Sequence, residues 1–343
     1  MREKRMRIHL DLPQKGYDII LERGGLKRAG EYLKLDRRVL IVTDSGVPSQ
    51  YASTVASQCA SPMIVTVPQG EASKSFSMLE MLCRKLMEGD FTRTDCVVAV
   101  GGGVVGDLAG FAAASYMRGI DFYNIPTTVL SQVDSSIGGK VAVNLDCVKN
   151  IVGAFYQPRC VLIDPDTLKT LPRRQIANGL AEAVKMSLTS DAALFSLFEE
   201  GRAENEIDTV IERSLRIKKQ VVEQDEQEHG LRRILNFGHT LGHGIEAAEQ
   251  LHGLYHGECV ALGMIPMCAD ALRPRLLGVL ETLGLPTQLE GDIEAMLELA
   301  SHDKKCTGKD ISVVWVEDPG YCQIRKMPLE VWKDQIRETM KTL

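Results

Sequence analysis

The 343-residue sequence lacks several features that would place it in a large class of proteins. Its nine cysteines include no C-x-x-C pair and are odd in number, which is typical of reduced thiols rather than a disulfide framework. Positive charge is not in excess, since the net charge is −6 at pH 7, and a nucleic acid partner would require a positive field. No apolar run follows the basic residues near the start, so we expect no signal peptide and a cytoplasmic protein.

A long hydrophobic run that would indicate a membrane span is also missing. The nearest candidate, residues 96–117, is long enough but carries Asp107 near its middle and three consecutive glycines. An aspartate at the centre of a bilayer costs about 2.5 to 3.5 kcal/mol, and glycine is a poor residue for a helix centre. We therefore predict a strand, a turn and a helix here, and no membrane partner.

Hydrophobic residues make up 44% of the chain, which predicts a globular protein with a full core. In the first half, apolar runs at residues 37–44, 63–68, 95–103 and 122–128 predict strands, and residues 75–90 predict an amphipathic helix. Apolar strands that alternate with helices form mostly parallel sheets with both faces covered. We therefore expect a Rossmann-like α/β domain.

The second half has a different composition. Long stretches are rich in Ala, Leu, Glu and Lys, and one late hairpin is predicted at residues 311–326. Pro165 and Pro172 mark the change. We predict two domains, an α/β domain of residues 1–168 and a mainly α-helical domain of residues 169–343.

A glycine-rich turn follows the third predicted strand. Gly101, Gly103 and Gly106 fit G-x-G-x-x-G between a strand and a helix, which lets backbone N–H groups approach a pyrophosphate. The alternative is a tight turn that packs the helix on the sheet. The pattern also departs from the standard Rossmann order, because the turn follows the third strand and only Asp121 lies about 20 residues on as a ribose acceptor.

Two further polar loops follow predicted strands. One contains Glu71 and Lys74, and the other runs from Thr127 to Lys140. Loops of this composition are ordinary turns in many proteins. Ligands of open α/β sheets bind at the carboxyl ends of strands, so several such loops at one sheet edge favour a nucleotide crevice.

Histidine is scarce in the chain, yet four of its seven histidines lie in one short stretch, at His239, His243, His252 and His256. Residues four apart share a helix face, and the segment that joins the two pairs leads to Gly253, so we expect the pairs to lie on different elements. A catalytic metal commonly takes two histidines and one carboxylate. We predict a metal site here, with an ordinary surface position as the favoured interpretation of His252.

The candidate carboxylate is Glu182, three residues before Lys185 on a helix of small and apolar residues. The pair is either a surface ion pair or an acid and a base that face a polar cavity, and the apolar surroundings favour the cavity. A second polar group, residues 218–236, leads to the first of the clustered histidines. It places Arg232 and Asn236 near the metal, and arginine binds carboxylates through two hydrogen bonds. A solvated helix face is the alternative for this segment.

Five motifs together resemble those of the 3-dehydroquinate synthases. They are GGGVVGDLAGFAAASYMRGI, IPTTVLSQVDSSIGGKVAVN, LAEAVKMSL, LNFGHTLGHGIE and HGE, in this order along nearly the whole chain. The resemblance implies a lyase that uses NAD and one divalent metal, zinc or cobalt. Its small-molecule substrate is a phosphorylated sugar acid, 3-deoxy-D-arabino-heptulosonate 7-phosphate. Transient oxidation, phosphate elimination, reduction, ring opening and aldol closure convert it to 3-dehydroquinate and phosphate.

The resemblance also implies roles for individual residues. The implied metal ligands are Glu182, His239 and His256. The implied NAD-binding positions are Asp44, Glu71, Lys74, Gly102, Gly103, Val104, Asp107, Thr127, Thr128, Lys140, Lys149, Thr167, Thr170 and Leu171. The implied substrate and catalytic positions are Asp134, Lys140, Asn150, Lys185, Lys218, Arg232, Asn236, His243, Lys305 of the Lys304 and Lys305 pair, and Arg118, which reaches the neighbouring site in a homodimer.

Other activities share this architecture. A 2-deoxy-scyllo-inosose synthase acts on glucose 6-phosphate, which lacks the carboxylate that Arg232 and Lys218 would bind. A glycerol-dehydrogenase-like enzyme carries out net oxidation and accumulates NADH. A catalytically inactive nucleotide-binding protein is disfavoured because every expected catalytic position is occupied. Gly46, Leu241 and Gly244 replace residues more usual in the family, and none of them is an implied metal ligand.

Overall fold

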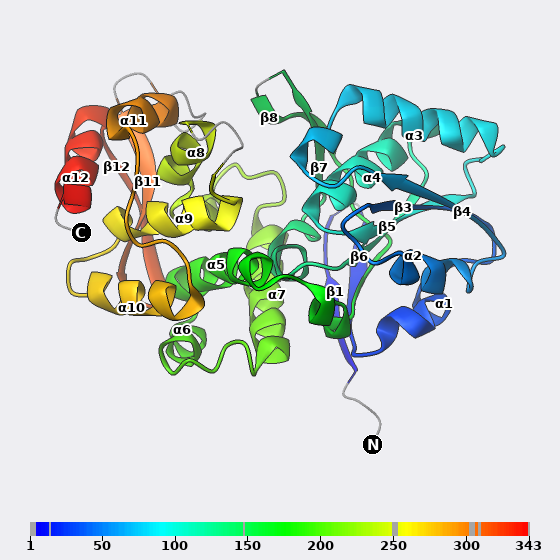
Figure 1. Cartoon of the computed structure of the whole chain (residues 1–343), viewed down its shortest axis with the longest axis horizontal. Helices are drawn as coiled ribbons and strands as arrows, with labels where there is room; N and C mark the ends of the chain where they lie inside the picture. Colours follow the sequence, from blue (N-terminus) through cyan, green and yellow to red (C-terminus); the bar gives the residue numbers. More distant parts are fainter. Residues whose placement is uncertain are drawn as a thin grey trace. The chain divides into compact units, whose positions relative to one another are not determined.

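The computed structural model describes residues 5–13, 15–146, 148–248, 253–301, 306–307 and 310–341. The chain divides into two compact units, Met1–Pro172 and Arg173–Leu343 (Figure 1). The predicted site residue Lys305 lies outside the described residues, as do Lys304 and His252.

The first unit is built on a mostly parallel sheet. Its strands, in the order β1-β2-β9-β6-β5-β3-β4, pair in parallel except for the antiparallel pair of β1 and β2. The strands are β1 (Met6–Leu10), β2 (Tyr17–Leu21), β3 (Arg38–Asp44), β4 (Ser61–Val67), β5 (Cys96–Gly101), β6 (Asp121–Pro126) and β9 (Cys160–Ile163). The four strands predicted from the sequence are β3, β4, β5 and β6, so the expected α/β class is confirmed.

Helices cover both faces of this sheet. Because side chains alternate along a strand, Val39 and Ile41 of β3 pack on one face, in a cluster with Val55. Leu40 and Val42 pack on the other face. The covering helices are α1 (Ala29–Tyr32) and α2 (Ser49–Ala56) on the first face, and α3 (Phe76–Glu88) and α4 (Gly103–Ser115) on the second (Figure 1).

The strand order places a topological switch point between β3 and β5. From β3 the chain goes to β4 on one side, and then returns to β5 on the other side. Ligands of open α/β sheets bind outside the carboxyl ends of the strands at such a point. Since β3 ends at Asp44 and β5 at Gly101, the glycine turn after the third predicted strand lies where a nucleotide crevice is expected.

Residues 96–117, which are as long as a membrane span, form β5, the glycine turn and α4, with a short 3-10 turn, η3 (Tyr116–Arg118), after them. This is the strand, turn and helix that the sequence predicts. Across the part of the chain that the structure describes, no helix has the length and apolar character needed to cross a bilayer.

The first unit also contains elements that the sequence does not predict. A two-stranded hairpin pairs β7 (Lys140–Leu145) with β8 (Val148–Phe155), and a π-helical turn, η4 (Ser131–Ser135), precedes it. The sequence does not predict strands β1, β2 and β9 either. Strand β9 has four residues, too few for its apolar run to be told from other buried segments.

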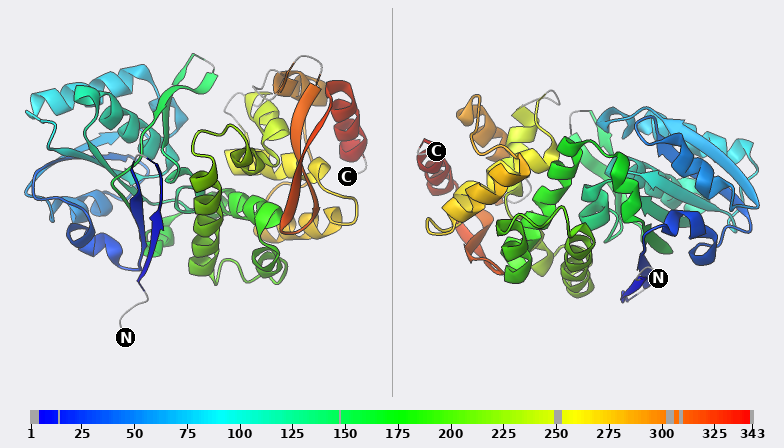
Figure 2. Two further views of the ribbon diagram at one scale, coloured as in Figure 1. Left: turned by 180° about the vertical axis from the view of Figure 1, so that it is seen from behind. Right: turned by 60° about the horizontal axis from the view of Figure 1, so that its bottom comes forward.

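The second unit is mainly helical, as predicted, with α5 (Arg173–Ser190) at its centre, where residues 177–189 are all buried. The predicted late hairpin is confirmed as β11 (Asp310–Asp318) paired with β12 (Tyr321–Pro328), a long twisted ribbon in Figure 2. The remaining described helices are α6 (Ala192–Glu199), α7 (Ile207–Gln224), η6 (Leu231–Asn236), α8 (His239–Ala248), α9 (His256–Met264), η7 (Ile265–Met267), α10 (Arg273–Leu283), α11 (Ile293–Ser301) and α12 (Leu329–Lys341).

Candidate active site

Three helices of the second unit bring Glu182, His239 and His256 together. Glu182 lies in the middle of α5, whereas His239 and His256 are the first residues of α8 and α9. The Nε2 atoms of His239 and His256 lie 3.5 and 3.3 Å from Oε1 of Glu182. One oxygen and two nitrogen atoms converge within 4.8 Å of one another, the donor set of a catalytic zinc or cobalt site.

Glycines allow these helices to approach closely. A Cβ at Gly257 would lie 2.0 Å from the carbonyl oxygen of Asn178 on α5. A Cβ at Gly263 on α9 would lie 2.0 Å from the carbonyl oxygen of Gly238, which has φ of +75° just before α8. The histidines therefore occur among glycines because only glycine lets the backbones of α5, α8 and α9 come close enough for the ligand atoms to meet.

Each of the two histidines is oriented through its second ring nitrogen. Nδ1 of His239 lies 3.1 Å from the carbonyl oxygen of Phe237, and Nδ1 of His256 lies 3.4 Å from Oε2 of Glu246. Metal-bound histidines usually donate this N–H to a carbonyl or carboxylate, which directs Nε2 toward the metal. Both rings have this arrangement here.

Burial and charge in this cluster fit a divalent cation. The Glu182 side chain is fully buried beside Lys185, and neither of its oxygens has a regular hydrogen-bond partner among the described residues. Burial raises the pKa of the Glu182 carboxyl, but Lys185 and the two histidines outweigh it and hold that pKa well below the ordinary value. Burial and Lys185 lower the pKa of His239, while the carboxylates of Glu182 and Glu246 overcome burial and raise the pKa of His256 to about 10. Glu182 and Glu246 favour a positive charge on the His256 ring. A metal cation bound to Glu182, His239 and His256 would supply that positive charge in place of a proton.

Three cationic side chains of the second unit are buried, and one of them, Lys185, contacts Glu182 of this cluster. Lys185, Lys218 and Arg232 are 1%, 5% and 3% exposed, an unusual burial for cations outside ion pairs and ligand sites. They lie on α5, α7 and η6, which pack against one another. Arg232 donates to the carbonyl oxygen of Glu226, and its backbone N–H donates to Oδ2 of Asp225 at 3.0 Å. The guanidinium is thus buried with one N–H directed to a backbone carbonyl, and a guanidinium can bind an anion through two hydrogen bonds.

His243 and Asn236 complete this part of the predicted set. The His243 ring is exposed, and its centroid lies 5.4 Å from that of His239 and 6.1 Å from that of His256. Nδ2 of Asn236 donates to Oε1 of Glu228 at 2.7 Å. The exposed imidazole is the member of this histidine group that a ligand from solvent can reach most readily.

In the first unit, a polar network gathers four predicted residues near the start of α4. Nζ of Lys74 donates to Oδ2 of Asp107 at 2.7 Å and to Oδ1 of Asn150, and lies 3.6 Å from Glu71. Asn144 donates to Glu71 at 2.9 Å and accepts from the backbone N–H of Asn150 at 2.9 Å. Burial lowers the pKa of Lys74, but Asp107 and Glu71 outweigh it and raise that pKa, so a charged ammonium lies at this edge of the sheet.

The glycine turn lies beside the loop that follows β6. A Cβ at Gly102 would lie 3.0 Å from Cγ2 of Thr128, and one at Gly103 would lie 3.0 Å from Oγ of Ser135. The side-chain oxygen of Thr128 accepts from the backbone N–H of Ser131 at 3.2 Å. The first turn of α4 thus faces a hydroxyl-rich loop, which is suited to a phosphate at the helix N-terminus.

The other predicted NAD-binding residues occupy the same half of the chain. Asp44, at the end of β3, accepts from the backbone N–H of Gly46 at 2.7 Å, and burial raises the pKa of its carboxyl. Oγ1 of Thr167 accepts from Gln132 at 3.1 Å. Further NAD positions are the buried Thr127, the half-buried Val104, Lys149 and Leu171, and the exposed Lys140 and Thr170. Asp134, which is predicted for substrate, is half-buried as well.

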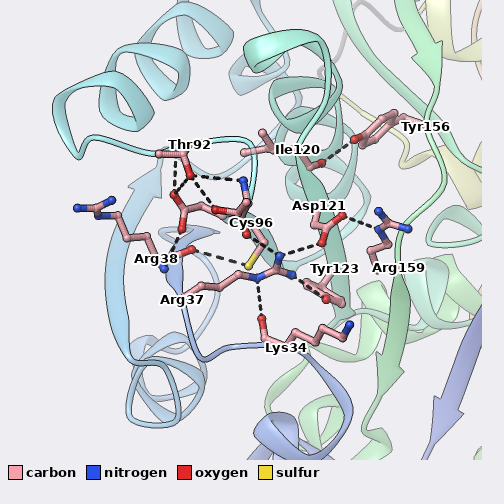
Figure 3. Close-up of polar contacts among 12 residues, drawn as sticks. Lys34, Arg37, Arg38, Thr92, Cys96, Ile120, Asp121, Tyr123, Tyr156 and Arg159 are labelled. Atoms are coloured by element: carbon pink, nitrogen blue, oxygen red, sulfur yellow. Dashed lines mark hydrogen bonds and ion pairs between the residues drawn. The ribbon is translucent and has the colours of Figure 1, made fainter.

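Asp121, the ribose acceptor considered from the sequence, lies at the wrong end of the sheet. It pairs with Cys96 at the start of β5, whereas the glycine turn follows the end of that strand. Its carboxylate contacts Arg37 at 2.9 Å and Arg159 at 2.5 Å (Figure 3). Burial raises the pKa of Asp121, but the two guanidinium groups outweigh it and lower that pKa. Asp121 is therefore part of a structural network at the amino ends of β5 and β6.

Arg118 lies in an unusual turn of the first unit. It is exposed, with φ of +66°, and Met117 before it has φ of +50°. Positive φ is uncommon outside glycine and is maintained most often where function requires it.

The sequence interpretation missed some residues near the metal cluster. Glu246 follows His243 by three residues, a helical spacing that would have indicated a carboxylate on the same face. Glu228, which accepts from Asn236, lies in a polar segment with no distinguishing pattern. Asn178 on α5 accepts from the backbone N–H of Gly257 at 2.6 Å, and only the folded structure shows this contact.

Comparison with known proteins gives matches over nearly the whole chain. The family model described as 3-dehydroquinate synthase N-terminal matches residues 64–178, and the one described as 3-dehydroquinate synthase C-terminal matches residues 179–306. A 3-dehydroquinate synthase of Streptococcus suis (strain 05ZYH33) is 40% identical, over 95% of this chain and 98% of that protein. One from Streptococcus mutans is 39% identical, over 97% of this chain and 100% of that protein.

Solved structures of related cyclases share the fold. A 2-deoxy-scyllo-inosose synthase complexed with carbaglucose-6-phosphate, NAD+ and Co2+ aligns with a TM-score of 0.88 at 26% identity, covering 97% of this chain and 100% of that chain. A 2-epi-5-epi-valiolone synthase from Streptomyces hygroscopicus with NAD+ and Zn2+ bound aligns with a TM-score of 0.88 at 28% identity, covering 97% and 98%. A probable glycerol dehydrogenase from Sinorhizobium meliloti, at 17% identity and a TM-score of 0.65, shares the fold alone.

Proposed function

Because this chain belongs to the 3-dehydroquinate synthase family, we propose that the clusters described above carry out that family's reaction in the roles given below. The chain converts 3-deoxy-D-arabino-heptulosonate 7-phosphate to 3-dehydroquinate and phosphate, as a carbon–oxygen lyase that depends on NAD and a divalent metal. The observation that carries this conclusion is the 39 to 40% identity over nearly the full chain to enzymes of this name. The convergence of Glu182, His239 and His256 supports it independently.

We assign Glu182, His239 and His256 as the ligands of one zinc or cobalt ion. Three protein donors leave a coordination position open for substrate, and Phe237 and Glu246 orient the two rings. When bound, the metal supplies a Lewis acid and NAD supplies a reversible hydride acceptor. Because the hydride returns to the substrate within one turnover, the net reaction needs no redox partner.

We assign the first unit, and residues 1–168 within it, as the NAD-binding domain. Lys74 offers a positive charge, held by Asp107, and Gly102 and Gly103 permit close approach of a phosphate to the start of α4. The further positions that we assign to NAD are Asp44, Glu71, Val104, Thr127, Thr128, Lys140, Lys149, Thr167, Thr170 and Leu171.

We assign residues 169–343, which include the whole second unit, as the metal- and substrate-binding domain. The buried cations of this unit suit a substrate with two anionic groups. The planar guanidinium of Arg232 can donate two parallel hydrogen bonds to a carboxylate. Lys218 lies on α7, which packs against the η6 turn that contains Arg232. Lys185 holds a positive charge next to Glu182. We assign the exposed His243 to holding the phosphate or passing a proton. The remaining positions that we assign to substrate are Asp134, Lys140, Asn150, Asn236 and Lys305.

We further propose a cytoplasmic homodimer in which Arg118 reaches the neighbouring subunit's site. The exposed side chain of Arg118 and its positive φ support a role in contact with a second subunit. The side chains of Met117, Val148 and Phe155 are also 42 to 53% exposed, and apolar surface of this kind is suited to contact with a second copy.

The test is phosphate release from 3-deoxy-D-arabino-heptulosonate 7-phosphate with NAD present at less than one equivalent. We expect many phosphates per NAD, loss of release on chelation of the metal, and recovery with zinc. No release from NAD-bound, zinc-loaded protein would contradict the assignment. Activity on glucose 6-phosphate instead would identify an inosose synthase, and steady accumulation of NADH would identify a dehydrogenase.

A further inference from the structure

One face of α5 contacts the first turn of α9 at three successive positions. Arg174, Asn178 and Glu182 are spaced four residues apart, so their side chains lie on the same side of the helix. Glu182 meets the ring of His256. The other two contact the backbone and side chains immediately before and after His256.

Arg174 holds the segment that enters α9. Its Nε and Nη2 atoms donate to the two carboxylate oxygens of Glu258 at 2.6 and 2.7 Å, and Nη2 also donates to the carbonyl oxygen of Gly253 at 2.8 Å. The guanidinium lies over the ring of Tyr255, 4.1 Å from its centroid. Glu258 accepts in turn from the backbone N–H of Tyr255 at 2.7 Å. One arginine therefore fixes residues on both sides of His256.

Asn178 satisfies a backbone group inside the same turn. Its Oδ1 accepts from the N–H of Gly257 at 2.6 Å, and the contact is buried. The first N–H groups of a helix have no partner within the helix, so this bond caps α9 from a neighbouring helix. The absence of a Cβ at Gly257 makes the approach possible.

We propose that Arg174 and Asn178 are positioning residues that set the metal affinity of the site by fixing the start of α9, and with it the ring of His256. The inference rests on the proposed metal site. His256 is the ligand that most needs such support, because its side chain is 30% exposed, against 11% for His239 and 0% for Glu182. Metal sites accept ligand displacements of about 0.2 Å, and loss of an orienting contact typically weakens metal binding by about 10- to 100-fold.

The experiment measures binding of Zn2+ alone to the chelator-stripped full chain, by competition with a chromophoric chelator, and the visible absorption bands of the Co2+ form. The variants are Arg174→Ala, Asn178→Ala and the conservative Asn178→Asp, with Arg173→Ala as the matched control on the adjacent exposed position. Thermal unfolding of the metal-free chains separates a loss of stability from a loss of metal affinity. NAD affinity serves as an internal reference for an intact first unit.

We expect the two alanine variants at 174 and 178 to bind Zn2+ about tenfold or more weakly and to shift the Co2+ bands. Arg173→Ala should match the unaltered chain. Asn178→Asp should also bind nearly normally, because it keeps the acceptor and adds negative charge at a helix N-terminus.

Normal Zn2+ affinity and unchanged Co2+ bands in both alanine variants would overturn the inference. A lowered melting temperature of the metal-free chains in that case would show a merely structural role. Failure of the proposed metal site would look different. In that case the unaltered chain would bind no stoichiometric Zn2+, or Glu182→Ala would bind it equally well.

Discussion

The close contact between Gly257 and α5 predicts the effect of one added methyl group. In Gly257→Ala the Cβ would lie 2.0 Å from the carbonyl oxygen of Asn178, whereas ordinary contacts begin at 3.4 Å. That carbonyl belongs to a buried helix and cannot rotate away, so the first turn of α9 must move by about 1.4 Å, the difference between these distances. The neighbouring residue His256 moves with it.

A displacement of this size affects both stability and metal binding. Overpacking of this kind costs about 1 to 3 kcal/mol of the free energy of unfolding. Since metal sites accept ligand shifts of about 0.2 Å, we expect the Zn2+ affinity to fall by about 100-fold. Chelator competition measures the affinity, and urea unfolding of the metal-free chain measures the stability. Phosphate release at limiting zinc should fall in the same proportion as zinc occupancy.

Gly278→Ala provides a matched control. Gly278 lies on the exposed side of α10, and nothing lies within 4 Å of an added Cβ there. Replacing glycine by alanine in an exposed helix raises the free energy of unfolding by about 0.5 to 1 kcal/mol. This variant should therefore gain stability and keep its Zn2+ affinity. The reasoning is refuted if Gly257→Ala behaves like Gly278→Ala in both assays.

Other substitutions test the remaining parts of the site and fold. Arg232→Ala should lower kcat/KM for phosphate release by about 30-fold or more, since truncating a buried charged partner costs about 2 to 5 kcal/mol; an unchanged value would remove the carboxylate assignment. Lys74→Ala should weaken NAD binding about tenfold in calorimetric titrations and leave Zn2+ affinity unchanged. Asp121→Asn should lower the free energy of unfolding at pH 7 by about 1 to 3 kcal/mol, because it removes the anion between Arg37 and Arg159. Since the pKa of Asp121 lies below its ordinary 3.8 in the folded chain, this difference should be complete above that pH and disappear as the pH falls through the lowered value, in urea titrations at several pH values.

The central strands could be predicted because their apolar residues follow each other without interruption. The hairpin of β11 and β12 could be predicted because apolar residues recur along both sides of its turn. The hairpin of β7 and β8 could not. Its strands mix lysine and asparagine with apolar residues, and several of those apolar side chains remain exposed. Nor does any local pattern reveal that β2 pairs in parallel with β9, more than a hundred residues later.

The metal cluster could be predicted from Glu182 and the clustered histidines, because few chemistries need that combination on apolar helices. The residues that hold these ligands in position could not be predicted. Arg174 lies in the first turn of α5 with no distinguishing pattern around it, and its partner Glu258 lies far along the chain. Asp121 was considered for NAD because sequence distance alone does not say at which end of a strand a residue lies. The switch point between β3 and β5, a property of strand order, explains why the glycine turn follows the third predicted strand.

The three assigned metal ligands extend from residue 182 to residue 256 along the chain. An ion bound to all three would cross-link the chain and close a loop of this length, much as a disulfide does. By the loop-entropy relation for such cross-links, closing a loop of about 75 residues is worth about 4.5 kcal/mol. A cell short of zinc would then hold a form of this chain that opens more often and is degraded faster. Zinc starvation would therefore reduce the number of enzyme molecules as well as the activity of each one.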